Sequence, residues 1–205
     1  MKIATIGIDL AKNVFQIHAA DARGRCVNAQ QLSRKKLAPY IANTPPCVIG
    51  MEACNGAHYW ARRFQAMGHE VRLMNPQFVK PYVKSNKNDR YDAEAICEAV
   101  RRPTMRFVEI KSEDQQAVLA IHRARDLVVR QRTQVVNMNC SILREFGHIM
   151  PTGIEAVSKF AIEHGTEEQL EMPEIADGIL GVMCHQLNGL NARIDELTKL
   201  IEQHV

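Results

Sequence analysis

The stretch KIATIGIDLAKNVFQIHAAD at residues 2–21 decides the fold that we expect for this chain. Its first part, KIATIGI at 2–8, is apolar and β-branched, and VFQIHAAD at 14–21 repeats that character after a short polar interruption. Runs of this length and composition favour β-strands. The ARGR at 22–25 can turn the chain into a third strand, CVNAQQL at 26–32. The N-terminal part therefore predicts a meander of three antiparallel strands.

Helical and strand patterns alternate after the meander. We expect, in chain order, a helix at 34–43, a buried strand at 47–53, an amphipathic helix at 57–68, a strand at 69–76, a helix at 89–102 and a short strand at 105–110. The segment at 77–88, QFVKPYVKSNKN, is polar and interrupted by Pro81, so we expect a loop there. This α/β order matches a ribonuclease-H-like (RuvC-like) mixed sheet with flanking helices.

The pattern changes to long helices from Ser112 onward. A helical pattern continues to about Phe146, with apolar residues every seven positions at Ile121, Val128, Val135 and Ile142. A second one runs from about Glu174 to the end, and Leu187, Leu190, Ile194, Leu197 and Ile201 keep a 3-4-3-4 spacing. We therefore expect two domains, 1–111 and 112–205, the second being a helical coiled-coil segment. Its helices should pair within the chain or between chains, as a dimer or a tetramer.

Composition narrows the class of protein. The six cysteines lack a CxxC pair and the eight histidines form no HxxxH or HxH, which predicts a reduced, cytoplasmic protein without structural zinc. No apolar run approaches the roughly 20 residues that a membrane helix needs, so we expect no membrane association. Residues 1–147 hold 23 Lys/Arg against 13 Asp/Glu, a net +10, whereas residues 148–205 hold 3 against 10, a net −7; together they give the +3 of the whole chain. A basic part at 1–147 followed by an acidic part at 148–205 indicates that the basic part binds a polyanion.

Four acidic residues stand out by position. They are Asp9 at the end of the first strand, Glu52 at the end of the fourth, and Asp89 and Asp92 at the start of the helix after the fifth. In a ribonuclease-H-like sheet the first and fourth strands are neighbours, so their carboxyl ends should lie side by side. Four converging carboxylates without a cation would cost several kcal/mol. Two Mg²⁺ ions about 3.5–4 Å apart would turn them into a hard-oxygen site for phosphodiester attack. Considered alone, Asp89 could be a helix cap and Asp92 a favourable first-turn charge.

Basic residues accompany this acidic group. Candidates for nucleic-acid contact are Lys12, Lys84, Lys87 and Arg90 near the acids, and Arg123, Arg125, Arg130 and Arg132 along the long helix. Neutralised phosphates release counterions, which makes such a cationic approach favourable. Solvated surface charges are the alternative for any single one of these residues. We expect Tyr59 and Trp60 to belong to the core rather than to stack on bases.

Three blocks of the sequence resemble the signature blocks of the DEDD insertion-sequence transposases, a family that includes the Piv DNA invertase and the bridge-RNA-guided recombinases. The blocks are DLAKN at 9–13, MEACNG at 51–56 and DRYDA at 89–93, and RARDLVVRQRTQ at 123–134 is similar to the family's arginine-bearing helix. The resemblance implies a RuvC-like N-terminal domain in which Asp9, Glu52, Asp89 and Asp92 form a catalytic acidic tetrad that binds Mg²⁺, for which Mn²⁺ can substitute. It also implies a coiled-coil dimerisation segment and a structured guide (bridge) RNA that pairs with donor and target DNA.

One departure from the family pattern bears on the activity we expect. Members of that family carry a C-terminal domain whose serine becomes covalently linked to DNA, and this chain ends before such a domain. None of its serines, at 33, 85, 112, 141 and 158, has a matching context, so no serine is assigned as a nucleophile. The leading hypothesis is a subunit of a transposase or site-specific DNA recombinase. The alternatives are a stand-alone Mg²⁺-dependent nuclease or junction resolvase, and a non-catalytic module for nucleic-acid binding and dimerisation.

Overall fold

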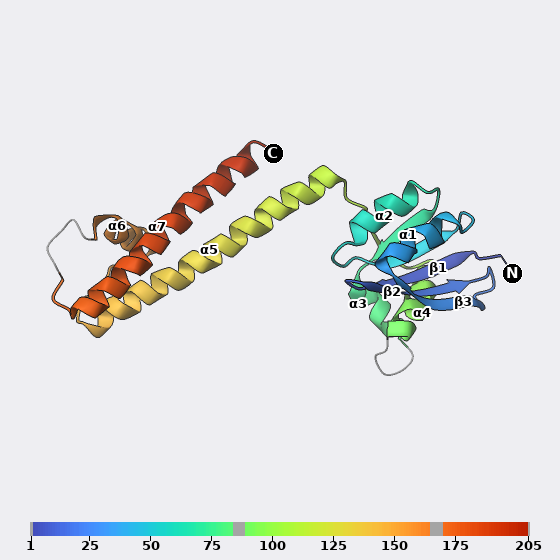
Figure 1. Cartoon of the computed structure of the whole chain (residues 1–205), viewed down its shortest axis with the longest axis horizontal. Helices are drawn as coiled ribbons and strands as arrows, with labels where there is room; N and C mark the ends of the chain where they lie inside the picture. Colours follow the sequence, from blue (N-terminus) through green and yellow to red (C-terminus); the bar gives the residue numbers. More distant parts are fainter. Residues whose placement is uncertain (1, 84–88, 165–169, 205) are drawn as a thin grey trace. The chain divides into compact units, whose positions relative to one another are not determined.

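The structure is a computed structural model that describes residues 2–83, 89–164 and 170–204. The side chains of Asp89 and Arg90 lie outside this description, as do Lys84 and Lys87. The chain divides into two compact units, Met1–Ser112 and Glu113–Val205 (Figure 1). Each unit is described by itself.

The described part of the first unit is built on a six-stranded mixed sheet in the order β3-β2-β1-β4-β5-β6. The strands are β1 (Thr5–Leu10), β2 (Val14–Ala20), β3 (Cys26–Ser33), β4 (Val48–Glu52), β5 (Glu70–Met74) and β6 (Phe107–Val108). β1, β2 and β3 pair antiparallel, which confirms the predicted meander. β4 pairs parallel with both β1 and β5, and β6 closes the edge antiparallel to β5. The expected mixed α/β class is confirmed.

Helices cover both faces of this sheet (Figure 1). α1 (Arg34–Ala42) and α2 (Ala57–Gln65) enclose the main core on one face, where Ile6, Ile8, Trp60 and Phe64 are buried. α4 (Asp89–Ala99) lies on the opposite face, where its Ile96 joins a second cluster with Met74 and Val79. Trp60 is 3% exposed, as predicted for a core residue. Tyr59, however, is 43% exposed, so the core prediction was wrong for that residue because it stands on the outer side of α2.

The loop predicted at 77–88 begins as helix. α3 (Pro76–Val79) and a 3₁₀ turn, η1 (Lys80–Tyr82), precede the residues that the structure does not describe. Asn75 starts α3, because its side-chain oxygen accepts a hydrogen bond from the Gln77 N–H at 3.1 Å. Pro76 stands at the first helical position, where the missing N–H costs nothing.

The second unit consists of α5 (Glu113–Glu145), α6 (Ile154–Glu163) and α7 (Glu174–Glu202) within the described residues. α5 and α7 pack against each other, and α6 packs beside them (Figure 1). Buried residues of the two predicted apolar seams meet in one cluster, among them Val135, Leu187 and Leu190. The long helices therefore pair within the chain. Whether they also form a coiled coil between chains stays a prediction.

In the part of the chain that the structure describes, no helix has the length and apolar character required to cross a membrane.

Candidate metal centre and nucleic-acid interface

Asp9 and Glu52 stand at the ends of neighbouring parallel strands. Ile8 of β1 pairs with Met51 of β4, and the two acids are the next residue on each strand. Both are half-buried. The prediction that the first and fourth strands lie side by side is therefore confirmed, and with it the proximity of these two strand ends.

Two glycines show which face of the sheet the acids occupy. A Cβ added to Gly7 would lie 2.2 Å from the Ala93 carbonyl oxygen of α4, and one added to Gly50 would lie 2.8 Å from the Cβ of Val100. Side chains alternate between the faces along a strand. Asp9 follows Gly7 by two residues, and Glu52 follows Gly50 by two. Both acids therefore project from the face that α4 covers.

The direction of α4 brings its first turn to the same end of the sheet. Just after its C-terminal end, the Arg101 guanidinium donates to the Ala22 carbonyl at 2.8 Å, beside the beginning of β1. The middle of the helix contacts Gly7. The helix thus runs antiparallel to β1, and the positions of Asp89 and Asp92 come at the end where β1 reaches Asp9. Asp92 is half-buried, and the side chain of Asp89 is outside the described residues.

The strand ends carry a concentrated negative charge. Burial raises the pKa of the Cys54 thiol, and the neighbouring carboxylates of Glu52 and Asp9 raise that pKa further. The charges of both carboxylates therefore reach the same thiol. Hard carboxylate oxygens are the ligands that Mg²⁺ prefers, so these two residues fit a divalent cation in charge and in donor type.

A complete ligand set is not assembled among the described side chains. No group of three or more His, Cys, Asp or Glu residues in that part of the chain is close enough to hold a metal ion. Asp9 and Glu52 are brought together, whereas Asp92 does not complete a three-residue group with them. The fourth member of the predicted tetrad, Asp89, falls outside this search.

The predicted cationic residues near the acids fall into two groups. Lys12 is exposed, and it lines a pocket of about 590 Å³ together with Arg34 and Cys54, just beyond the end of β1. Lys84 and Lys87 lie outside the described residues, and Arg90 is described only as a position on the first turn of α4. The pocket at Lys12 therefore represents the described cationic approach to the strand ends.

The arginines predicted along α5 are divided between two environments. Arg123 and Arg130 are exposed, seven residues apart. Arg125 is half-buried, and its Nε donates to the Thr198 hydroxyl of α7 at 2.9 Å. Arg132 is also half-buried, and its Nε has no hydrogen-bond partner in the structure. Arg123 and Arg130 are thus the pair of this stripe most open to a ligand, whereas Arg125 helps to hold α5 against α7.

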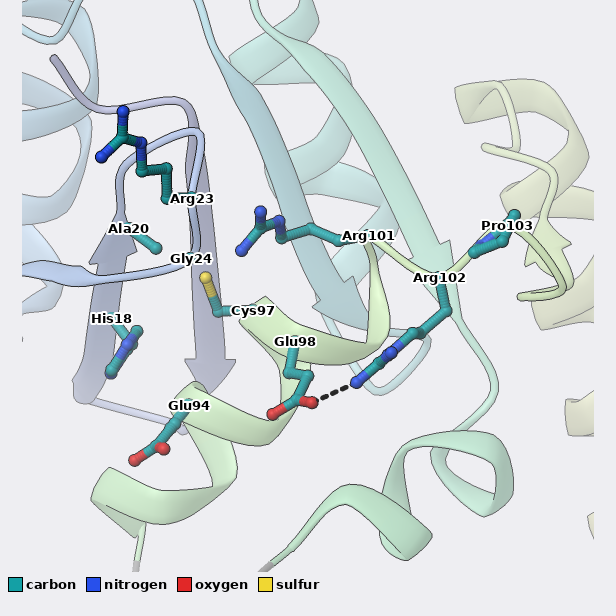
Figure 2. Close-up of a pocket in the computed structure, with 10 residues that line it drawn as sticks. All are labelled: His18, Ala20, Arg23, Gly24, Glu94, Cys97, Glu98, Arg101, Arg102 and Pro103. Carbon is teal, nitrogen blue, oxygen red and sulfur yellow. Dashed lines mark hydrogen bonds and ion pairs between the residues drawn. The ribbon is translucent and has the colours of Figure 1, made fainter.

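Figure 2 shows a further pocket, of about 430 Å³, between the C-terminal half of α4 and the turn that joins β2 to β3. Arg101 reaches this turn, and Gly24, with φ +83°, leaves the space that its guanidinium occupies. Glu98 forms an ion pair with Arg102. Burial raises the pKa of the Cys97 thiol to about 12, which keeps it protonated and unreactive. The Arg101 contact attaches the turn to the end of α4, and we assign this pocket a structural role.

Sequence reasoning missed the two glycines that admit α4. The signal was present, because IGID at 6–9 and IGME at 49–52 repeat one pattern, with a glycine two residues before each acid. A glycine inside a strand indicates close approach of another backbone. The repeat therefore marks the face on which both acids stand.

Comparison with known proteins places these features in a family. A model of the DEDD transposases of IS110, described as a transposase, matches residues 6–148. The chain is 42% identical over 203 residues to the transposase for insertion sequence element IS1328 of Yersinia enterocolitica, an alignment that covers 99% of this chain and 60% of that protein. It is 44% identical over 206 residues to a probable family 20 transposase of Pseudomonas aeruginosa, covering 100% and 61%. With the transposase for insertion sequence element IS1111A of Coxiella burnetii it shares 43% identity over 151 residues, covering 74% and 42%. The chain thus spans about three fifths of the length of the first two relatives.

Proposed function

The chain belongs to the IS110 family of DEDD transposases, and we propose on this basis that it acts in DNA transposition through a RuvC-like, ribonuclease-H-like domain in its first unit. The four residues proposed to bind a divalent metal are Asp9, Glu52, Asp89 and Asp92. The observation that carries this proposal is the position of Asp9 and Glu52. They end adjacent parallel strands on the face of α4, and both carboxylates act on the Cys54 thiol.

Each residue has a defined part in this centre. Asp9 and Glu52 supply ligands from the rigid sheet, which fixes their separation. Asp89 and Asp92 would add ligands from the first turn of α4. Two bound Mg²⁺ ions, for which Mn²⁺ can substitute, would supply Lewis-acid stabilisation of the charge on a phosphodiester. Lys12 would bind a phosphate of the nucleic acid beside the strand ends.

The same proposal extends to the partners. DNA would be bound by the basic part of the chain, through Lys84, Lys87 and Arg90 near the acids and through Arg123 and Arg130 on α5. The half-buried Arg125 and Arg132 would add to this charge. A structured guide RNA is a second proposed ligand, held through its backbone and 2′-hydroxyls. The net charge of +10 over residues 1–147 supports polyanion binding. We also propose homo-oligomers formed through the long helices as a coiled coil, and action in the cytoplasm.

The test measures metal binding apart from catalysis. Mn²⁺ is titrated into the protein, and the free ion is followed by electron paramagnetic resonance. Asp9→Asn and Glu52→Gln should each weaken binding by at least about tenfold, because each removes one charged ligand. Glu155→Gln is the matched control, since it removes the same charge from an exposed position at the start of α6.

DNA cleavage or strand transfer with Mg²⁺ is then compared in Asp9→Asn, Asp92→Asn and Glu155→Gln, with and without RNA that copurifies. The expected result is that Asp9→Asn and Asp92→Asn abolish activity while Glu155→Gln retains it. Unchanged Mn²⁺ binding in both Asp9→Asn and Glu52→Gln would rule out the proposed metal centre.

A further inference from the structure

A pocket of about 470 Å³ opens on the first unit where α3 and η1 meet the segment that leads into β6. Phe78 and Tyr82 line it from the helical side, and Thr104, Met105 and Arg106 line it from the other. Its volume is within the range of small-ligand sites. The Lys12 pocket and the pocket of Figure 2 are separate from it, since no lining residue is shared.

The lining of this pocket combines aromatic rings with positive charge. Phe78 is 38% exposed, so a large apolar ring faces solvent here. Tyr82 is half-buried against the cluster around Met74, and the guanidinium of Arg102 lies over its ring, 5.7 Å from the centroid. A ring held in this way is fixed in orientation, which lowers the entropic cost of stacking a ligand on this side of the pocket.

The charge around the pocket selects among ligands. Arg106 lines it, and Lys80 belongs to the same 3₁₀ turn as Tyr82. Among the described lining residues there is no carboxylate, whereas Glu94 and Glu98 line the pocket of Figure 2. Gln77 and Thr104 add an amide and a hydroxyl that can bond the edge of a planar heterocycle. An anionic ligand with a flat aromatic part fits this combination.

We propose that this pocket receives one unpaired nucleobase, with its ribose, from a bound nucleic acid. The base stacks on Phe78 beside Tyr82, and Arg106 neutralises the adjoining phosphate. Every base has an aromatic face, so such stacking is tolerant of sequence. The inference rests on the proposed nucleic-acid binding, and it defines the substrate further, as a nucleic acid with an unpaired nucleotide.

The position of the pocket in the chain connects it to the proposed metal centre. Its two sides are formed by 77–82 and 104–106, which directly precede and follow the segment that contains Asp89 and α4. A base held here would therefore be bound by the residues at the two ends of the segment that carries half of the acidic tetrad. Its capture would position the nucleic acid relative to that segment.

The test uses two hairpin probes that differ only in one nucleotide, a 2-aminopurine that is either paired in the stem or bulged out. Both are titrated with the full chain in EDTA, so that metal binding has no part in the signal. We expect the bulged probe to bind about five- to 150-fold more tightly than the paired one, the range that one stacked base contributes. The fluorescence of the 2-aminopurine should be quenched on binding.

Variants assign this preference to the pocket. Phe78→Ala should bind both probes equally and leave the 2-aminopurine fluorescence unquenched. Phe78→Leu fills the same space without an aromatic face, so it should lose quenching while keeping the thermal unfolding curve of the wild type. Phe78→Trp should restore both the preference for the bulged probe and the quenching of its fluorescence. Tyr59→Ala is the control, because Tyr59 is a similarly exposed aromatic residue on α2, outside the pocket.

The outcomes separate this inference from the proposed function. If the wild type binds both probes equally, or if Phe78→Leu keeps the quenching, the base pocket is wrong while nucleic-acid binding stands. A pocket that binds a peptide instead of a base would give equal binding of the two probes by the wild type and by Phe78→Leu. If neither probe binds, both the pocket and the proposed nucleic-acid binding are overturned. The metal centre is tested independently by the Mn²⁺ titration.

Discussion

Gly7 and Gly50 let α4 and the residue after it approach closely the face of the sheet on which the two acids stand. Replacing Gly7 with alanine places a Cβ 2.2 Å from a backbone oxygen and 2.5 Å from the Cys97 backbone nitrogen, so the helix itself has to move. We expect Gly7→Ala to destabilise the first unit by about 1–3 kcal/mol or more. The corresponding fall in Tm is at least roughly 4 °C for a unit of this size. Calorimetry measures it.

Gly178 provides the control for this prediction. It lies inside α7, and a Cβ added there meets no atom within 4 Å. Gly178→Ala should stabilise the second unit slightly, because alanine is the better helix former by about 0.5–1 kcal/mol. A Gly7→Ala protein that melts like the wild type would show that α4 does not pack on β1 as described.

The hydrogen bonds of Asp21 predict how the free energy of unfolding depends on pH in the acid range. It is 7% exposed, and its carboxylate accepts hydrogen bonds from the N–H groups of Arg23 and Arg25 and from the Arg25 guanidinium, at 2.9–3.0 Å. The hydrogen bond from the Arg25 backbone is the main cause that lowers the pKa of this carboxyl in the folded state below its usual range. The unfolded chain therefore binds the proton more readily than the folded one.

The contribution of Asp21 to the free energy of unfolding is consequently present above the pKa of its carboxyl in the unfolded chain. It is lost as the pH falls through the lower pKa of the folded state. Asp21→Asn should lower the free energy of unfolding at pH 7 and should make its decline below pH 4 shallower than in the wild type. Urea unfolding at pH 7 and pH 3 measures both. Equal losses for wild type and variant between these pH values would contradict the assignment.

At this scale the sequence predicted that Asp9 and Glu52 stand on neighbouring strands, but it did not predict the close packing of α4 on Gly7. Asp9 and Glu52 could be paired in advance because a meander followed by a parallel strand makes β1 and β4 neighbours. The contact of Gly7 with α4 does not follow from the sequence, since a glycine in a strand is compatible with a bulge as well as with close packing. The ligand role of all four acids, Asp9, Glu52, Asp89 and Asp92, remains a prediction.

At the scale of elements, the last residues of the first unit are held by α2. The Lys111 N–H donates to the His58 Nδ1 at 3.2 Å, and the Arg62 guanidinium donates to the Lys111 carbonyl at 2.6 Å. One residue before Ser112, both of its backbone groups are thus bonded to a single helix. This contact fixes the segment from which the chain continues into α5.

The contact at Lys111 should depend on pH. His58 accepts through Nδ1 only when that atom is unprotonated. Burial lowers the pKa of His58 below that of a free imidazole, and the nearby charges of Lys111 and Arg62 lower it further. The stabilisation is therefore present above pH 6.5 and is lost as the pH falls through the folded pKa.

His58→Ala tests this dependence. The Tm difference between wild type and His58→Ala should be greatest near pH 7.5 and should shrink towards pH 5. His122→Ala, at an exposed position on α5, should show no such trend. A His58→Ala difference that is constant across this pH range would mean that the hydrogen bond does not contribute.

Periodicity predicted the long elements well and the short ones poorly. α5 and α7 were foreseen because 33 and 29 residues give many repeats of the apolar spacing. α3 and η1 were predicted as loop, since four and three residues contain no complete period and Pro81 argued against a helix. Their start depends instead on a local cap at Asn75, a signal that periodicity does not register. The base pocket proposed above is built on these short elements.

At the scale of the whole molecule, the order of elements predicted the class of fold, because a meander followed by alternating helices and strands admits few arrangements. The pairing of α5 with α7 was predicted only as one of two options. An apolar seam indicates that another helix covers this face. The apolar pattern is identical whether that partner helix comes from the same chain or from another. The structure establishes the pairing within the chain.

The distribution of charge over the whole chain gives the last prediction. If residues 1–147, with their net charge of +10, bind DNA and the acidic remainder does not, arginines of equal exposure should differ in effect according to the part they belong to. Arg123 and Arg130 are exposed on α5, and Arg193 is exposed on α7 in the acidic part. Affinity for duplex DNA falls with salt by a log–log slope of about 0.9 per phosphate contact. The double variant Arg123→Gln/Arg130→Gln should therefore reduce the slope by about 1.8, and Arg193→Gln should leave it unchanged.

The variant Arg125→Gln distinguishes this electrostatic effect on DNA binding from an effect on the stability of the second unit. Its hydrogen bond to Thr198 holds α5 against α7, so Arg125→Gln should lower the Tm of the second unit and change the salt slope less than the double variant does. Fluorescence anisotropy between 50 and 200 mM salt measures the slopes for all of these proteins. An equal reduction by Arg193→Gln would mean that DNA responds to the net charge of the chain rather than to a surface on α5. A slope unchanged in the double variant would place the phosphate contacts elsewhere in the basic part, near Lys12 and the strand ends.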